Sequence, residues 1–209
     1  MKNIKYCAVI IFLFFPCFFV GQIPQKDEQL KVVYSIEYAK IPFKIRMFQK
    51  HLPTKSVGYY SIIGSRNETN IDVKIMGDHM VHSTISVEND SLNLYWEKTQ
   101  TIVNDSVVDN IFIEKKARRE DSESKIILGA NKKTILGYSC ISFHFENDSS
   151  KTNGFLAPEI NGKGKFQNHG LPLELTVNSK KEKTIIVQRA KTISIEPLNR
   201  KKFILTEKK

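Results

Sequence analysis

The chain has 209 residues, with 32 lysines and arginines against 22 aspartates and glutamates, and a formal net charge of +10 at pH 7. Apolar residues make up 41% and charged residues 26%, which is the mixture of an ordinary globular protein. This composition excludes a collagen, a long coiled coil, a polytopic membrane protein and a small disulfide-rich protein. The length suits one domain, or at most two small ones, with enough chain to bury a core.

The N-terminus has the pattern of a secretory signal peptide. Two lysines precede an almost unbroken apolar run over 6–20, as in the n-region and h-region of such peptides. The run is shorter than the roughly 20 apolar residues that a transmembrane helix needs; a retained N-terminal anchor is the alternative. Neither Cys7 nor Cys17 follows a small residue, which argues against lipidation. We therefore expect cleavage between Gly21 and Gln22, and a protein exported to the periplasm or secreted.

Loss of the signal peptide changes the composition of the mature chain. Removal of 1–21 takes away two lysines and no acids, so the net charge falls from +10 to +8. The remaining residues, 22–209, are expected to form a single β-rich domain. They contain one cysteine, Cys140, which cannot form an internal disulfide. We expect Cys140 to be a buried, small apolar residue; a thiol that pairs with another molecule is the alternative.

Apolar and polar side chains alternate with a period of two through most of the mature chain, which indicates strands. The predicted strands are 32–38, 71–76, 92–97, 110–114, 140–145, 173–178, 185–187, 193–195 and 203–205. Clusters of Asn, Asp, Gly and Ser separate them, as in an antiparallel meander. We expect a mainly β protein, an antiparallel twisted sheet or half-barrel of about ten strands with little helix.

Two segments lack this alternation. Residues 114–124 have mixed charge and no apolar stripe, which favours a solvated loop or a short surface helix over a packed helix. Residues 151–168 contain three glycines and a proline and are expected to form a long excursion between strands. Long excursions in compact domains are often functional or mobile.

Sequence motifs for nucleophiles and phosphate binding are incomplete. The segment Gly137-Tyr138-Ser139-Cys140-Ile141 begins like a nucleophile elbow but lacks its closing glycine. Residues 162–165 have only a superficial likeness to a phosphate loop, because no serine or threonine follows the lysine. We therefore expect no catalytic residue and no cofactor. An enzyme is the less favoured alternative, and it would require His144, His169, Glu159 or Glu174 to converge in one cleft.

Metal and nucleic-acid sites are also not expected. His79 and His82 lie three residues apart in a segment that is predicted to be extended, so they would point to opposite faces of a sheet. The basic residues are spread over several separate segments and no aromatic platform accompanies them. They are expected to form a solvated surface, with attraction to anionic envelope surfaces as the alternative.

The C-terminal half carries three short segments in a recognisable order. They are Ile135-Leu136-Gly137-Tyr138-Ser139-Cys140, Phe155-Leu156-Ala157-Pro158-Glu159-Ile160 and Gly170-Leu171-Pro172-Leu173-Glu174-Leu175. This order resembles the GLPGLI family of exported bacterial envelope proteins. The motif positions are Gly137, Tyr138, Cys140, Pro158, Glu159, Gly170, Leu171 and Pro172. The Gly-Leu-Pro-Leu-Glu form is also similar to a neighbouring uncharacterised exported family, which is thought to share the curved sheet of lipoprotein carriers.

Either resemblance implies a β-rich envelope protein and transfers no catalytic residue. The hypothesis that follows is a non-enzymatic envelope protein that binds an apolar ligand or a partner chain on a curved sheet. The alternative is a structural or assembly adaptor for an outer-membrane or secretion complex. An envelope hydrolase comes third.

Overall fold

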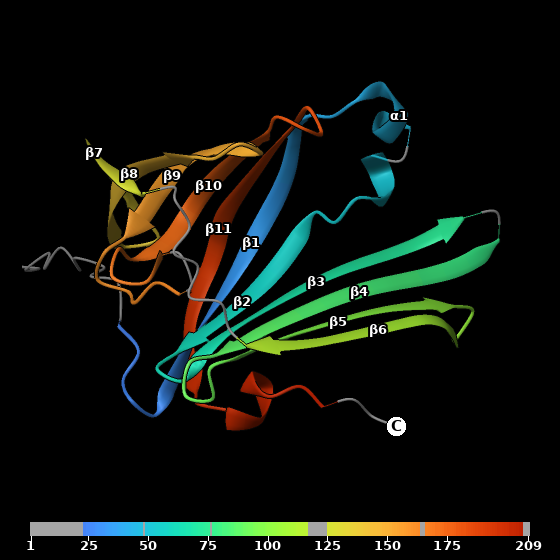
Figure 1. Ribbon diagram of the computed structural model, residues 1–209, viewed down its shortest axis with the longest axis horizontal. Helices are drawn as coiled ribbons and strands as arrows, with labels where there is room; N and C mark the ends of the chain where they lie inside the picture. The colour runs from blue at the N-terminus through green and yellow to red at the C-terminus, as the bar shows by residue number, and fades with distance from the viewer. Residues whose placement is uncertain (1–22, 48, 76, 117–124, 164–165, 207–209) are drawn as a thin grey trace, which may run out of the picture.

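The computed structural model describes residues 23–47, 49–75, 77–116, 125–163 and 166–206. Within these residues, eleven strands form one antiparallel sheet in the order β6-β5-β4-β3-β2-β1-β11-β10-β9-β8-β7 (Figure 1). The strands are β1 (Glu28–Lys40), β2 (Lys55–Ser61), β3 (Gly64–Ile75), β4 (Asp78–Asn89), β5 (Leu94–Val103), β6 (Ser106–Lys116), β7 (Ile127–Ile135), β8 (Tyr138–Glu146), β9 (Ser150–Ala157), β10 (Leu171–Ser179) and β11 (Thr184–Pro197). The predicted mainly β fold is confirmed, and the sheet stays open, with β6 and β7 as its edges.

Helices contribute little to the fold. The helix α1 (Phe43–Arg46) and the 3₁₀ helix η1 (Gln49–His51) connect β1 to β2, and the 3₁₀ helix η3 (Arg200–Phe203) follows β11. The strand predicted at 203–205 is wrong. Asn199 caps η3 instead, because its side chain accepts a hydrogen bond from the backbone N–H of Lys201, and Phe203 then turns into the core.

Three further segments differ from the prediction. The excursion expected over 151–168 is partly strand, since β9 runs to Ala157, and among the described residues only 158–163 and 166–170 lie outside the strands β9 and β10. The loop or helix expected over 114–124 begins as strand, because β6 continues to Lys116, and 117–124 lie outside the described residues. The strands predicted at 185–187 and 193–195 are parts of the single long strand β11.

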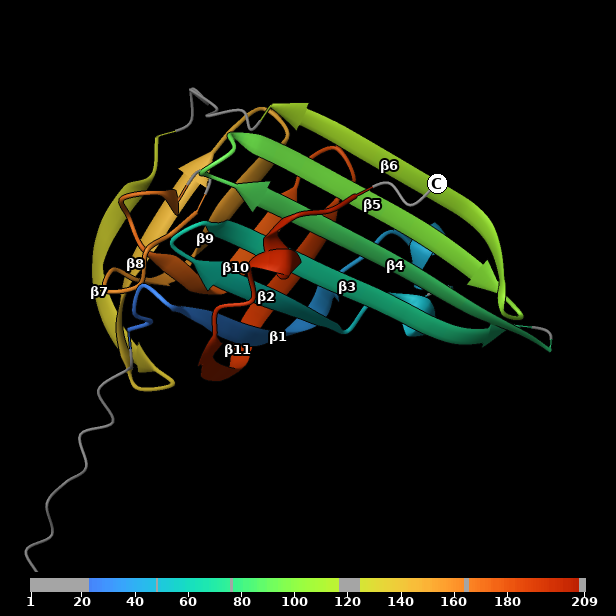
Figure 2. The same ribbon diagram turned by 90° about the horizontal axis from the view of Figure 1, so that it is seen from below.

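The sheet is strongly twisted and bent, so that β3 to β6 splay away from β7 to β10 (Figures 1 and 2). Irregular pairing accompanies the bend. The register between β1 and β11 shifts at Val33/Tyr34 and at Tyr38/Lys40, and the register between β9 and β10 shifts at Pro172/Glu174. Such bulges bend a strand and increase its local twist. The sheet consequently has a concave face.

Buried side chains form three clusters on this frame. The first joins Leu30, Val32 and Tyr34 of β1 to buried residues of β8, β10 and β11, including Cys140 and Leu173. The second lies on the face opposite Tyr34 and Tyr60, and it contains Tyr59, Val87, Trp96 and Phe203. The third contains Ile126, Phe143 and Leu156. The core is thus spread along the sheet in separate clusters on its two faces.

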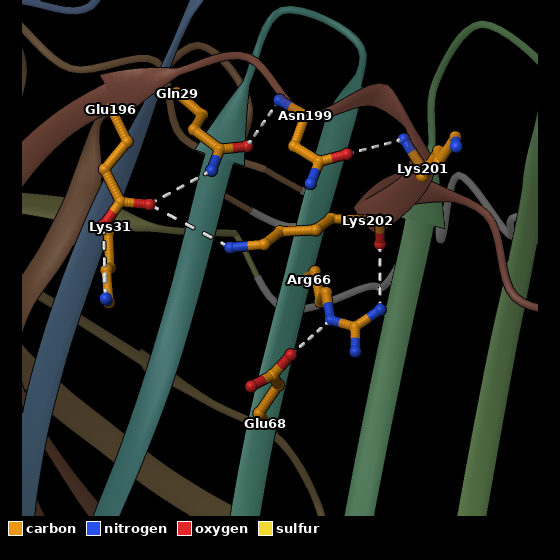
Figure 3. A network of polar contacts seen from close by, with 8 residues as sticks. All are labelled: Gln29, Lys31, Arg66, Glu68, Glu196, Asn199, Lys201 and Lys202. Atoms are coloured by element: carbon orange, nitrogen blue, oxygen red, sulfur yellow. Dashed lines mark hydrogen bonds and ion pairs between the residues drawn. The ribbon is translucent and has the colours of Figure 1, made fainter.

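A polar network holds the C-terminal segment against the sheet (Figure 3). Gln29 Nε2 donates to Glu196 Oε2 over 3.3 Å, and the backbone N–H of Asn199 donates to Gln29 Oε1 over 3.2 Å. The guanidinium of Arg66 donates to the carbonyl oxygen of Lys202 over 3.1 Å. These contacts join the end of β11 and η3 to β1 and β3, and they fix where Phe203 enters the second cluster.

Candidate functional site

A pocket of about 400 Å³ opens on the concave face of the sheet, on the side opposite the Trp96 cluster. Its walls come from β1, β2, β3, β4, β10 and β11, and from the segment 158–170. The apolar and aromatic lining residues are Tyr34, Ile36, Tyr60, Phe166, Leu171, Pro172 and Leu175. The polar and charged ones are Ser56, Ser65, Asn67, Thr69, Glu88, Lys163 and Gln188. The lining therefore combines apolar surface with many hydrogen-bonding groups.

The register of the strands explains why these side chains meet. Tyr34 of β1 pairs with Ser56 of β2, and Tyr60 of β2 pairs with Ser65 of β3. Ser65 pairs in turn with Glu88 of β4. Residues directly opposite one another in a ladder point to the same face. Pairing across the four strands β1 to β4 therefore places these side chains side by side on one face of the sheet, where they line the pocket.

The described residues of the segment 158–170, which are 158–163 and 166–170, form a roof over one side of the pocket. Phe166 packs edge-on against Phe143, with ring centroids 5.3 Å apart, and against Phe145, with centroids 6.1 Å apart. Lys163 Nζ forms an ion pair with Asp90 Oδ2 at 2.6 Å. The aromatic contacts fasten the segment to β8, and the ion pair fastens it to the end of β4. The roof therefore bridges the two halves of the bent sheet.

A chain of hydrogen bonds crosses the floor of the pocket. The hydroxyl of Tyr34 donates to the carbonyl oxygen of Pro172 over 3.2 Å and lies 3.3 Å from the hydroxyl of Tyr60. The Tyr60 hydroxyl also lies 3.3 Å from Asn67 Oδ1, to which it donates. Burial raises the pKa of both tyrosines, so that each hydroxyl is protonated at neutral pH. The amide nitrogen of Asn67 remains available as a donor at the pocket surface.

Charged groups gather on the β4 side of the pocket. Burial and the neighbouring carboxylate of Asp90 raise the pKa of Glu88, and Lys163 opposes that rise. A half-buried carboxyl of this kind accepts or donates hydrogen bonds according to its protonation state. Together with Tyr60 and Asn67 it gives the pocket one polar wall, while Phe166 and Leu175 give it an apolar one.

The structure brings two of the three motif segments together at a turn. Leu136 (φ 51°) and Gly137 (φ 87°) form the turn between β7 and β8. Tyr138 and Cys140 follow and are buried. The carboxylate of Glu159 accepts a hydrogen bond from the backbone N–H of Ser139 over 3.2 Å. The Glu159 side chain thus fastens the segment after β9 to the start of β8.

The third motif segment packs on the second. Gly170 has a φ of 125°, and a Cβ atom there would lie 2.4 Å from the carbonyl oxygen of Ala157 and 2.7 Å from the Cα of Pro158. Glycine is therefore required, both for its backbone angle and for the close approach of the two chains. Leu171 is buried and pairs with Ala157, and Pro172 lines the pocket. The motif positions thus build one wall and one end of the roof.

The other candidate residues lie apart from the pocket. His79 Nε2 lies 2.7 Å from Asp72 Oδ1, and His82 Nδ1 lies 2.9 Å from Thr101 Oγ1. Within the described residues, no three His, Cys, Asp or Glu side chains are grouped so that they could hold a metal ion. Glu174 pairs with Lys133 at 2.9 Å.

His144 and His169, the remaining candidates for catalysis, come from β8 and from the roof segment. Neither lines the pocket. The expected cleavage site at Gly21 and Gln22 lies outside the described residues.

Sequence reasoning missed Tyr34, Tyr60, Asn67 and Glu88 as pocket residues. They sit on strands where the local pattern shows only alternation, and they meet through pairing between distant segments. The one usable signal was the loss of alternation over 151–168, which overlaps the roof but also takes in the strand β9.

The protein is thus an open, strongly curved antiparallel sheet with a roofed pocket on its concave face. No family model matches the chain, and no curated protein matches it. Among solved structures it is similar to PNGF-II, at 10% identity and a TM-score of 0.50 over 85% of this chain and 30% of that one. It is also similar to a beta-barrel-like protein of the domain of unknown function DUF1849 from Brucella abortus, at 8% identity and a TM-score of 0.45. That match covers 82% of this chain and 99% of the other.

The likeness to PNGF-II shows the fold alone, and this chain spans about 30% of that protein's length. Among the described residues, no helix has both the length and the apolar character needed to cross a membrane.

Proposed function

We propose that the protein is a non-enzymatic, exported bacterial envelope protein that binds a ligand with an apolar portion in the roofed pocket. The pocket, with its apolar wall, its polar wall and a roof fastened to β8 and to the end of β4, is the observation that carries the proposal. Its volume of about 400 Å³ falls in the range of roughly 300–1,000 Å³ that small-molecule sites occupy.

The two walls set the character of the ligand. Phe166, Leu175 and Ile36 offer apolar surface, against which a hydrocarbon portion gains about 25 cal/mol for each Å² removed from water. Asn67 and Glu88 offer hydrogen-bonding groups at the opposite side. A purely apolar ligand would leave these groups without partners, which is costly. An amphipathic small molecule therefore fits better than a hydrocarbon.

A large side chain in place of one residue that lines the pocket should block ligand binding. Thr69 of β3 lines the pocket, and Asn70, the next residue, points to the other face and is exposed. We expect Thr69→Trp to abolish binding of dansyl-labelled undecanoic acid, measured by fluorescence titration. Asn70→Trp is the matched control and should bind like the wild type.

Bound material should also accompany the purified wild-type protein. Native mass spectrometry is expected to show an added mass that organic extraction removes, and Thr69→Trp should lack that mass. Absence of the added mass and of probe binding in the wild type would refute the proposal.

Export rests on the signal-peptide pattern and on the resemblance to the GLPGLI family, and it has its own test. The full chain, expressed with a C-terminal tag in a bacterium with two membranes, should fractionate outside the cytoplasm. Its intact mass should correspond to a first residue at Gln22. A cytoplasmic protein that retains Met1 would contradict export and would leave the binding proposal standing.

A further inference from the structure

The strand β6 is one edge of the sheet, and among the described residues it pairs only with β5. Figures 1 and 2 show it along the outer margin of the splayed half of the sheet. It has no proline or glycine, and its pairing with β5 is regular from Asp109 to Lys116. The backbone N–H and C=O groups on its outer side therefore form a continuous template for another strand.

The side chains of β6 are unusually apolar for an exposed edge. Val107 is 56% exposed, Ile111 48% and Ile113 42%. Natural edge strands are usually protected by bulges, inward charges or prolines. Both edges have an irregularity, but in different places. The pairing of β7 with β8 is interrupted in the middle of the strand, between Leu128 and Lys132. The register shift of β6 lies near its start, between Val107 and Asp109, and leaves the run from Asp109 to Lys116 regular.

We propose that β6 pairs antiparallel with β6 of a second copy of this chain, in the register centred on Phe112, so that the two sheets continue into one. Antiparallel pairing of a strand with itself relates the two copies by a twofold axis. A centre on a residue keeps odd-numbered positions opposite odd-numbered ones, so the faces of the two sheets stay continuous. This proposal is independent of what the pocket binds.

The register centred on Phe112 is the one in which the side chains of the two β6 strands are complementary in charge and in shape. In that register Asp109 lies opposite Lys115, and Ile111 lies opposite Ile113, each pair occurring twice by symmetry. Opposite charges and branched apolar side chains are the cross-strand pairs that stabilise a sheet. All four side chains belong to the same face of β6 and are exposed in the single chain.

Neighbouring registers lose this complementarity. With the centre at Ile111, Asp109 would lie opposite Ile113. With the centre at Ile113, Ile111 would lie opposite Lys115. Both arrangements set a charge against an apolar side chain and form no ion pair. Lys115 is also held on the correct face, since its Nζ lies 4.6 Å from the centre of the Tyr95 ring.

Charge substitution tests the pairing. We expect the wild type to show a concentration-dependent dimer in sedimentation velocity, and Asp109→Lys to weaken it roughly tenfold or more, because lysines would then face each other. The double variant Asp109→Lys/Lys115→Asp restores opposite charges and should restore the dimer. Asp148→Lys, an equal charge change at an exposed position between β8 and β9, should leave the dimer unchanged.

Disulfide trapping tests the register. In a chain with Cys7 and Cys17 replaced by serine, Ile111→Cys mixed with Ile113→Cys should give a cross-linked dimer on oxidation, and neither variant alone should. Cys140 is buried and does not interfere. Self-linking of Ile111→Cys or of Ile113→Cys would overturn the register. A wild type that remains monomeric up to millimolar concentration would overturn the pairing itself.

Discussion

The hydroxyl of Tyr34 donates a hydrogen bond to the main-chain carbonyl oxygen of Pro172, 3.2 Å away and 138 positions later in the sequence. The bond joins β1 to the beginning of β10, where pairing between β9 and β10 shifts register. Tyr34 is buried, and both residues line the pocket. One contact therefore links the first strand, the motif segment and the candidate site.

Removal of that hydroxyl should destabilise the protein. In Tyr34→Phe the half-buried Pro172 carbonyl loses the hydroxyl of a buried tyrosine, and we expect a cost of about 1–3 kcal/mol. Urea denaturation followed by circular dichroism measures the loss. Tyr38→Phe, on the same strand, removes a bond of 3.1 Å to the Pro53 carbonyl at a half-buried site, and we expect it to cost less. Equal losses in the two variants would contradict the special role of Tyr34.

We expect Gly170→Ala to destabilise the protein much more than Gly77→Ala, a substitution at another glycine with a left-handed backbone. Gly170→Ala brings a Cβ to 2.4 Å from a carbonyl oxygen, and we expect it to cost about 3 kcal/mol or more. Gly77 has a φ of 98°, and nothing lies within 4 Å of the position that a methyl group would take there. Gly77→Ala should therefore cost only about 1–2 kcal/mol of backbone strain. Thermal unfolding of the two variants separates steric overlap from strain.

The thiol of Cys140 should be inert in the folded protein. Burial raises its pKa to about 11, so the reactive thiolate is scarce at pH 8. We expect Ellman's reagent to modify Cys140 only after urea unfolding, in a chain with Cys7 and Cys17 replaced by serine. Rapid modification of the folded protein would contradict the burial.

The same pKa predicts a pH dependence of stability. Above the usual thiol pKa of about 8.5 the unfolded chain loses the Cys140 proton while the folded chain keeps it. This thiol therefore lowers stability progressively as the pH rises from about 8.5 toward 11. Cys140→Ala should show a shallower alkaline decline in urea midpoint than the parent chain.

Phe203 should anchor the C-terminal segment. It is fully buried, and its carbonyl oxygen accepts a hydrogen bond of 2.9 Å from the side chain of Asn89. We expect Phe203→Ala to cost about 3–5 kcal/mol, as large-to-small changes in cores do. Ile204, the next residue, is 46% exposed, and Ile204→Ala serves as the control with a loss below about 1 kcal/mol.

The alternation of apolar and polar residues along the chain was sufficient to predict the fold class and several of the strands. Alternation around Phe143 and around Leu173 placed β8 and β10, because one face of each strand is buried. It missed β2, β7 and β9, where glycines, lysines and tyrosines blur the period. The same alternation wrongly predicted a strand from Phe203 onward. The helix cap at Asn199 is a hydrogen bond, and a pattern of apolar and polar residues does not reveal it.

What the sequence by itself determined is the antiparallel β class, the burial of Cys140, and a break in strand alternation over 151–168, of which the part before Pro158 is strand in the structure. These follow from the alternation of neighbours, the count of cysteines and the clustering of glycines, all of which are local properties. Only the tertiary structure decided that Tyr34, Asn67 and Glu88 share one pocket. Their meeting depends on the register of four strands and on bulges that bend the sheet, and register is set by pairing between residues far apart in the chain.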